Sequence, residues 1–165
     1  MERREMMVES EYIRIMTESL EKKRDILGKV IELNKQQKFL LQDPNLSPEQ
    51  FEENMQYKAN LVDQLNLLDS GFEKLFNRVR DALNNNRDLY TSEIRRMQEL
   101  IKDITALLNT VQTQEVRNRE EVTRKFASVR EQVKGVRNSQ KVVNQYYQNM
   151  MKRGNVAPQF FDNKK

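Results

Sequence analysis

Acidic side chains are the residues of this chain that come closest to forming a catalytic or metal-binding site. The sequence holds 25 Asp and Glu residues, and carboxylates on facing helices can build a di-metal site, together with histidines from Glu-x-x-His motifs. The sequence contains no histidine and no cysteine. Its acids alternate with basic residues, as in residues 18–23 (Glu-Ser-Leu-Glu-Lys-Lys), which is typical of a solvated helix surface. Since glycine-rich phosphate loops and Gly-x-Ser-x-Gly motifs are also missing, we expect no catalytic, cofactor-binding or metal site, and no enzyme.

Composition predicts the elements that carry these charges. Hydrophobic residues make up 37% of the chain and charged residues 33%, with a mean hydropathy of −0.89 and only four glycines and three prolines. This profile is typical of a helical bundle or coiled coil with a thin, elongated core. No apolar run approaches the roughly 20 residues that span a bilayer, and residues 1–10 lack the apolar segment of a signal peptide. We therefore expect a cytoplasmic protein without membrane insertion.

Local signals divide the chain into three predicted helices, at about 8–42, 47–84 and 91–152. Residues 43–46 (Asp-Pro-Asn-Leu) end the first helix, because proline lacks an amide hydrogen and restricts the residue before it. Ser47 then begins the second helix as its N-cap, with Pro48 in the first turn and Gln50 completing a capping box.

The second connection is signalled by residues 84–86, three consecutive asparagines, which are poor helix formers. A single helix over 47–152 is the competing interpretation. The first helix carries polar residues at three core-type positions, Lys23, Asn34 and Gln37, which we expect to fix one alignment of the bundle. The predicted fold class is all-α: an elongated antiparallel three-helix bundle or coiled coil with an over-long C-terminal helix, forming one domain over 1–153 and followed by a flexible tail, 154–165.

The third predicted helix has an apolar stripe with steps of mostly three or four residues. At 1.5 Å per residue it would be about 90 Å long, and the other two helices are too short to cover it. Part of the stripe should therefore remain free for a partner. The half least able to be covered contains Val122, Phe126, Val129, Val133, Val136, Val143, Tyr147 and Met150. Because it is narrow, this stripe is equally suited to be the seam of a homodimer.

The same part of the chain is basic, with ten Lys and Arg against four acids over residues 114–153. This charge would suit nucleic acid or an acidic protein partner, or would simply keep an exposed helix soluble. Because the basic residues surround the helix and no nucleic-acid-binding motif accompanies them, we expect no nucleic-acid partner. The tail carries Phe160 and Phe161, which either pack on the bundle, lie in a frayed terminus, or compete for an exposed groove on the third helix.

Six short segments follow one another along the predicted helices and the tail: 12–16 (Tyr-Ile-x-x-Met), 58–68 (Lys-Ala-Asn-Leu-Val-Asp-Gln-Leu-Asn-Leu-Leu), 107–109 (Leu-Leu-Asn), 117–122 (Arg-Asn-Arg-Glu-Glu-Val), 143–147 (Val-Asn-Gln-Tyr-Tyr) and 158–165 (Pro-Gln-Phe-Phe-Asp-Asn-Lys-Lys). In this order they resemble the FlgN-type flagellar type III export chaperones. In this family a Lys-x-x-Leu-Leu-x-x-Leu segment and an asparagine in the long last helix recur. The related FliT-type chaperones have a similar helical architecture.

The resemblance implies a cytosolic chaperone that binds hook-associated (hook-filament junction) proteins, prevents their premature assembly and delivers them to the flagellar export apparatus. In this family the client's C-terminal amphipathic segment docks on the last helix of the chaperone. Carried onto this chain, the client-binding residues are those of the half-stripe from Val122 to Met150 given above. The alternative is a self-associating coiled-coil protein with no export role, whose long helix pairs with its own copy.

Overall fold

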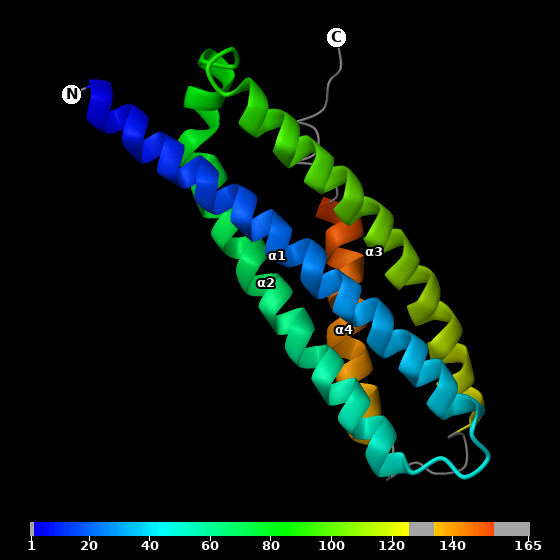
Figure 1. Cartoon of the computed structure of the whole chain (residues 1–165). Helices are drawn as coiled ribbons and strands as arrows, with labels where there is room; N and C mark the ends of the chain where they lie inside the picture. Colours follow the sequence, from blue (N-terminus) through cyan, green and yellow to red (C-terminus); the bar gives the residue numbers. More distant parts are fainter. Residues whose placement is uncertain (1, 126–133, 154–165) are drawn as a thin grey trace.

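The computed structural model describes residues 2–125 and 134–153, with the side chains of 2, 3, 5, 6, 134–140 and 151–153 left out of the description. Its helices are α1 (Glu2–Gln42), α2 (Pro48–Asn85), α3 (Thr91–Lys125) and α4 (Lys134–Arg153). α1 packs against both α2 and α3, and α4 packs mainly against α2 (Figure 1). α2 runs antiparallel to α1, whereas α3 runs parallel to α1. The prediction of an all-α bundle is confirmed.

The prediction of one over-long third helix is wrong. α3 ends level with the end of α1, where the Lys125 ammonium donates a hydrogen bond to the carbonyl oxygen of Leu41 at 3.1 Å. α4 runs in the direction of α2, opposite to α3, and packs along α2 (Figure 1). A continuous helix would carry these residues away from the bundle. The competing single helix over 47–152 is wrong as well, since α2 and α3 are separate elements.

The other helix boundaries follow local sequence signals. The Ser47 side chain accepts a hydrogen bond from the backbone amide of Gln50, as an N-cap should, and Pro48 is the first residue of α2. α2 ends at Asn85 and α3 begins at Thr91, within one residue of the predicted ends. α1 begins at Glu2 instead of about Val8, because the charged and methionine residues before the apolar stripe are good helix formers. The predicted tail, 154–165, lies outside the described residues.

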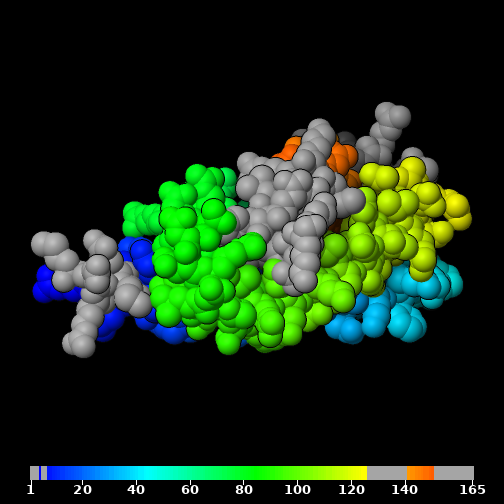
Figure 2. All heavy atoms as spheres, turned by 90° about the horizontal axis from the view of Figure 1, so that it is seen from above, coloured from blue at the N-terminus to red at the C-terminus, as the bar shows by residue number. Residues whose placement is uncertain are grey.

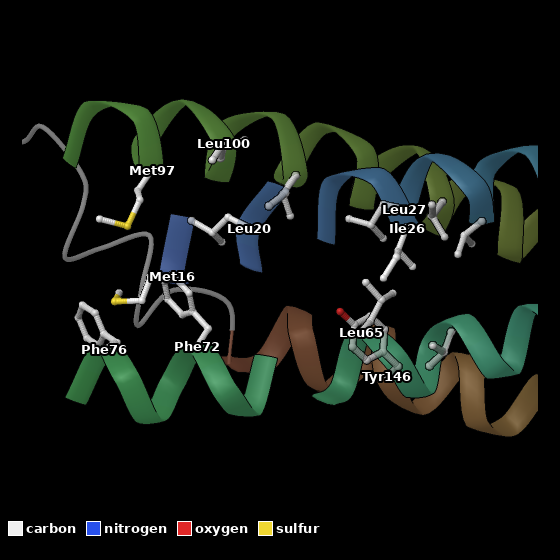
Figure 3. Close-up of a cluster of buried hydrophobic side chains, with 14 of the residues drawn as sticks. Met16, Leu20, Ile26, Leu27, Leu65, Phe72, Phe76, Met97, Leu100 and Tyr146 are labelled. Carbon is white, nitrogen blue, oxygen red and sulfur yellow. The ribbon is translucent and has the colours of Figure 1, made fainter. Parts of the chain in front are cut away.

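The buried apolar side chains form two separate clusters. The larger one runs along α1, α2 and α3 and includes residues of α4, and Figure 3 shows part of it, with Leu20, Leu27, Leu65, Phe72, Leu100 and Tyr146 among the labelled side chains. The smaller cluster contains Leu41, Phe51, Met55 and Val122, at the end of the bundle where α1 ends and α2 begins. Each large apolar side chain buried in these clusters contributes about 1.5–3 kcal/mol relative to an exposed one.

Candidate functional site

The residues of the predicted client-binding stripe lie in several different environments. Val122 is buried in the smaller cluster, and Val143 and Tyr147 are buried in the larger one, with Met150 partly buried beside them. The expectation of a free apolar face is therefore wrong at Val122, Val143 and Tyr147. Phe126, Val129 and Val133 lie outside the described residues, and the side chain of Val136, in α4, is not described. Whether the stripe binds a client stays a prediction.

Within residues 141–150, α4 packs four apolar residues of one face into the core, while Val142 and several polar residues are exposed. Val143, Tyr146, Tyr147 and Met150 follow the i, i+3, i+4, i+7 spacing of one helix face and pack into the larger cluster. Lys141, Gln145, Gln148 and Asn149 are exposed. Figure 2 shows part of α4, in orange, at the surface of the molecule beside the second half of α3, in yellow. α4 thus packs with one apolar face on the bundle, and we call the surface of the other helices that this face covers the α4 groove.

A chain of polar contacts joins α4 to α2 and α1 within this groove. The Tyr146 hydroxyl donates a hydrogen bond to Oδ2 of Asp69 at 2.9 Å. The other oxygen, Oδ1, accepts from the ammonium of Lys23 at 2.6 Å, and the Lys23 side chain is almost fully buried. Burial, and then the negative charge of Asp69, raise the pKa of the Tyr146 hydroxyl above its ordinary value of 10.0. Tyr146 therefore stays protonated and acts as a hydrogen-bond donor.

The neighbouring residue, Tyr147, has a different environment. Its ring meets that of Tyr146 edge to face, with centroids 5.3 Å apart. Among the described residues, the Tyr147 hydroxyl is buried without a hydrogen-bond partner. Burial, and then the charge of Glu115, raise its pKa well above 10.0. An unpartnered buried hydroxyl costs about 1–3 kcal/mol, so this residue weakens the packing of α4 that its ring otherwise favours.

A second polar group lies in the core at the level of Lys58, whose side chain has no exposed surface. Its ammonium donates to the Glu115 carboxylate at 2.7 Å and to the side-chain oxygen of Asn34 at 3.0 Å, joining α2, α3 and α1. Burial lowers the pKa of Lys58 below its ordinary value of 10.5, and the charge of Glu115 opposes that shift. The pair is charge-balanced, and its bonds leave little freedom to slide the three helices along one another.

Amides extend this buried polar layer toward the end of the bundle. Asn118 of α3 donates to the backbone oxygen of Asn34 at 3.0 Å and to the side-chain oxygen of Gln37 at 3.1 Å. Gln37 in turn donates to the side-chain oxygen of Asn54 in α2 at 3.0 Å. The bonds of Asn118 link α3 to α1 across 81 and 84 residues of sequence, and the bond from Gln37 to Asn54 links α1 to α2.

Two of the six residues of this layer, Asn34 and Gln37, were predicted from the sequence, as was the buried Lys23 outside it. Lys23, Asn34 and Gln37 were expected at core positions of the first helix, and their burial is confirmed. Asn54, Lys58, Glu115 and Asn118 are also buried but were not predicted. Spacing could have found two of them: Lys58 continues the core positions of Met55 and Val62, and Glu115 continues those of Val111 and Val122.

No protein-family model, no curated protein and no solved structure matches the chain. Within residues 2–125 and 134–153, no three acidic side chains gather where they could hold a metal ion. In that same part of the chain, no helix combines the length and apolar character needed to cross a membrane.

Proposed function

We propose that this protein binds an amphipathic helical segment of another protein, and that the segment takes the place of α4 in its groove. The observation that carries the proposal is α4 itself, which packs as an amphipathic helix with apolar anchors at i, i+3, i+4 and i+7. Helix-in-groove recognition uses this same spacing of anchors. A groove that accepts one such helix within the chain has the shape and apolar surface to accept a similar one from a client.

The resemblance to FlgN-type chaperones supplies the identity of the client in this proposal. The client is a hook-associated flagellar protein, bound through its C-terminal amphipathic segment in the cytoplasm and released to the export apparatus. Two residues in the segments that carry the resemblance, Lys58 and Asn118, belong to the buried polar layer that aligns α1, α2 and α3. In this proposal they hold the groove in shape and do not touch the client.

In this proposal the client helix makes the same kinds of contact that α4 makes, so that the bundle keeps its buried face during the exchange. A tethered helix competes at an effective concentration in the millimolar range, so a client must bind the open groove tightly to displace it. The Tyr147 hydroxyl, which has no hydrogen-bond partner among the described residues, lowers the affinity of α4 for its own groove. This reduces the affinity that the client needs.

The test is light scattering coupled to size exclusion, with the full chain and a peptide of the C-terminal segment of a hook-associated protein from the same organism. We expect a 1:1 complex, together with faster amide hydrogen exchange in α4 and unchanged exchange in α1, α2 and α3. A stable dimer that does not respond to the peptide would contradict the proposal and favour the self-associating coiled coil.

The variant Val143→Asp identifies the surface that the client contacts. It places a charge on the buried face of α4 and should release α4 from its groove. If the client replaces α4, the variant binds the peptide at least tenfold more tightly. If the client instead packs on the stripe residues of α4, as the sequence alone predicts, the variant binds more weakly. The matched control is Val142→Asp, at the neighbouring exposed position, which should leave affinity unchanged.

A further inference from the structure

Asp69 gives the α4 groove a polar contact point. Its side chain is 24% exposed with α4 in place, and it receives one hydrogen bond from Lys23 of α1 and another from Tyr146 of α4. Lys23 belongs to the bundle and stays when α4 leaves. Departure of α4 would therefore free one carboxylate oxygen, Oδ2, and leave it needing a donor.

The charge around Asp69 restricts which donor is suitable. The ammonium of Lys23, 2.6 Å from Oδ1, already balances the carboxylate. A Lys or Arg from an incoming helix would add an unbalanced positive charge beside a buried ammonium, and an Asp or Glu would face the carboxylate itself. A neutral donor, such as a tyrosine hydroxyl or a carboxamide, completes the hydrogen bonding without either cost.

At the adjacent position, that of Tyr147, the groove favours an apolar side chain instead of a hydrogen-bond donor. The Tyr147 side chain fills a buried space, but its hydroxyl finds no hydrogen-bond partner among the described residues. An apolar ring or aliphatic side chain there would keep the packing and avoid a desolvated hydroxyl. The groove thus favours a hydrogen-bond donor at the position of Tyr146 and an apolar side chain at the next position.

We infer that the groove selects client helices with an apolar residue at i, a neutral hydrogen-bond donor at i+3 and apolar residues at i+4 and i+7, and that Asp69 recognises the donor. The pattern corresponds to Val143, Tyr146, Tyr147 and Met150 of α4. The inference rests on the proposed exchange of α4 for a client, and adds to it the chemistry by which a client segment is chosen.

The test uses the full chain carrying Val143→Asp and, as probe, a fluorescent synthetic peptide of residues 134–153. Fluorescence anisotropy compares this peptide with versions carrying Tyr146→Phe, Tyr146→Lys or Tyr147→Phe. Since a hydrogen bond to a charged group is worth a factor of about ten or more in affinity, we expect Tyr146→Phe and Tyr146→Lys to weaken binding at least tenfold. Tyr147→Phe should bind equally well or more tightly, and serves as the matched control.

A double-mutant cycle assigns the effect to Asp69. Lys23→Met together with Asp69→Leu removes the ion pair from the receiving chain without leaving a buried charge. In that chain, peptides with Tyr146 and with Tyr146→Phe should bind with equal affinity. If the tenfold difference persists there, Asp69 does not recognise the donor and the inference is wrong.

The outcomes separate this inference from the proposed function. Equal binding of the Tyr146 and Tyr146→Phe peptides to the Val143→Asp chain would overturn the inference and leave the groove as a helix-binding site. No binding of any peptide to that chain, with its circular dichroism still helical, would contradict the proposed function itself. If Val143→Asp prevents folding, hydrogen exchange in the otherwise unaltered chain decides: α4 should exchange faster with Tyr146→Phe but not with Tyr147→Phe, and equal rates overturn the inference.

Discussion

Lys58 shows how strongly a single buried charge constrains this bundle. Its ammonium is fully enclosed and bonded to Glu115 and Asn34. A buried ion pair is weak evidence for net stability, because desolvation offsets most of the attraction, but loss of one partner leaves an uncompensated charge. The pair is better understood as setting the alignment of α1, α2 and α3.

The first prediction follows from this asymmetry. Lys58→Met should lower the free energy of unfolding by about 3–5 kcal/mol, because Glu115 would remain buried without its partner. Adding Glu115→Leu should recover most of that loss. Urea denaturation followed by circular dichroism measures both, with Arg14→Ala as control, since Arg14 pairs with Glu11 and Glu18 on the exposed surface, where such pairs are worth about 1 kcal/mol or less. Equal losses for Lys58→Met and Arg14→Ala would show that the layer does not constrain the core.

The side chains of this layer also mark how far the sequence could predict the site. A polar residue at a core-type position was recognisable in the first helix, where Asn34 and Gln37 interrupt an apolar seam. The core positions of Lys58 and Glu115 could have been found from spacing, but their pairing could not, because residues of these types also cover helix surfaces elsewhere in the chain. Only the three-dimensional alignment of α2 with α3 shows that the two charges meet.

At the level of the helices, two glycines lie inside long helices without an evident packing reason. Gly28 in α1 and Gly71 in α2 both have open space where a β-carbon would be placed. Glycine destabilises a helix interior by about 0.5–1 kcal/mol relative to alanine. No close approach of another helix compensates for that cost at either position.

The second prediction is that Gly28→Ala and Gly71→Ala each stabilise the protein. The expected gain is about 0.5–1 kcal/mol per substitution, additive in the double variant because the sites are on different helices. Thermal unfolding by circular dichroism measures the gain, and client affinity should be unchanged. A lower melting temperature for either variant would mean that the glycine is needed for a bend or a contact.

Helix boundaries were predictable where the chain carries a turn residue and not elsewhere. Ser47 with Pro48, and the asparagines at 84–86, placed two connections correctly. The boundary between α3 and α4 carries no such signal: residues 126–133 contain no proline or glycine, and Val129 and Val133 continue the apolar spacing. The long helix was predicted because its local pattern is uninterrupted. Packing of α4 against α2 overrides that local preference.

For the molecule as a whole, buried tyrosines link stability to alkaline pH. Burial raises the pKa of Tyr146 and Tyr147, and also that of Tyr90, above the ordinary 10.0. The unfolded chain releases these protons above about pH 10 while the folded chain keeps them, so the free energy of unfolding falls as pH rises further. Below pH 10 both states are protonated and the stabilisation is complete. Burial lowers the pKa of Lys58, so the folded chain loses this proton before the unfolded chain does. Lys58 therefore makes the free energy of unfolding rise with pH, but only up to about pH 10.5, where the unfolded chain loses the proton as well.

The third prediction is a loss of about 1.4 kcal/mol per pH unit above pH 10.5 for each of Tyr146 and Tyr147, whose pKa values are raised most. Urea denaturation at several pH values between 9 and 12 measures the slope, and tyrosinate absorbance reports ionisation directly. In the variant with Tyr146→Phe and Tyr147→Phe, the free energy of unfolding should fall less steeply with pH, because the contributions of these two tyrosines to the slope are missing. An unchanged slope in this variant would show that the two hydroxyls ionise freely in the folded protein.

The parallel pairing of α1 with α3 has a consequence for the order in which the protein forms. Asn118 bonds to Asn34, 84 residues earlier in the chain, so α1 and α2 can form a hairpin as they are synthesised but must wait for α3 before their shared core closes. Contacts between distant residues slow folding, because the chain loses the entropy of loop closure before it gains the stabilising contacts. During synthesis, the apolar faces of α1 and α2 remain unprotected until nearly three-quarters of the chain exists, and the nascent hairpin is the stage most exposed to aggregation.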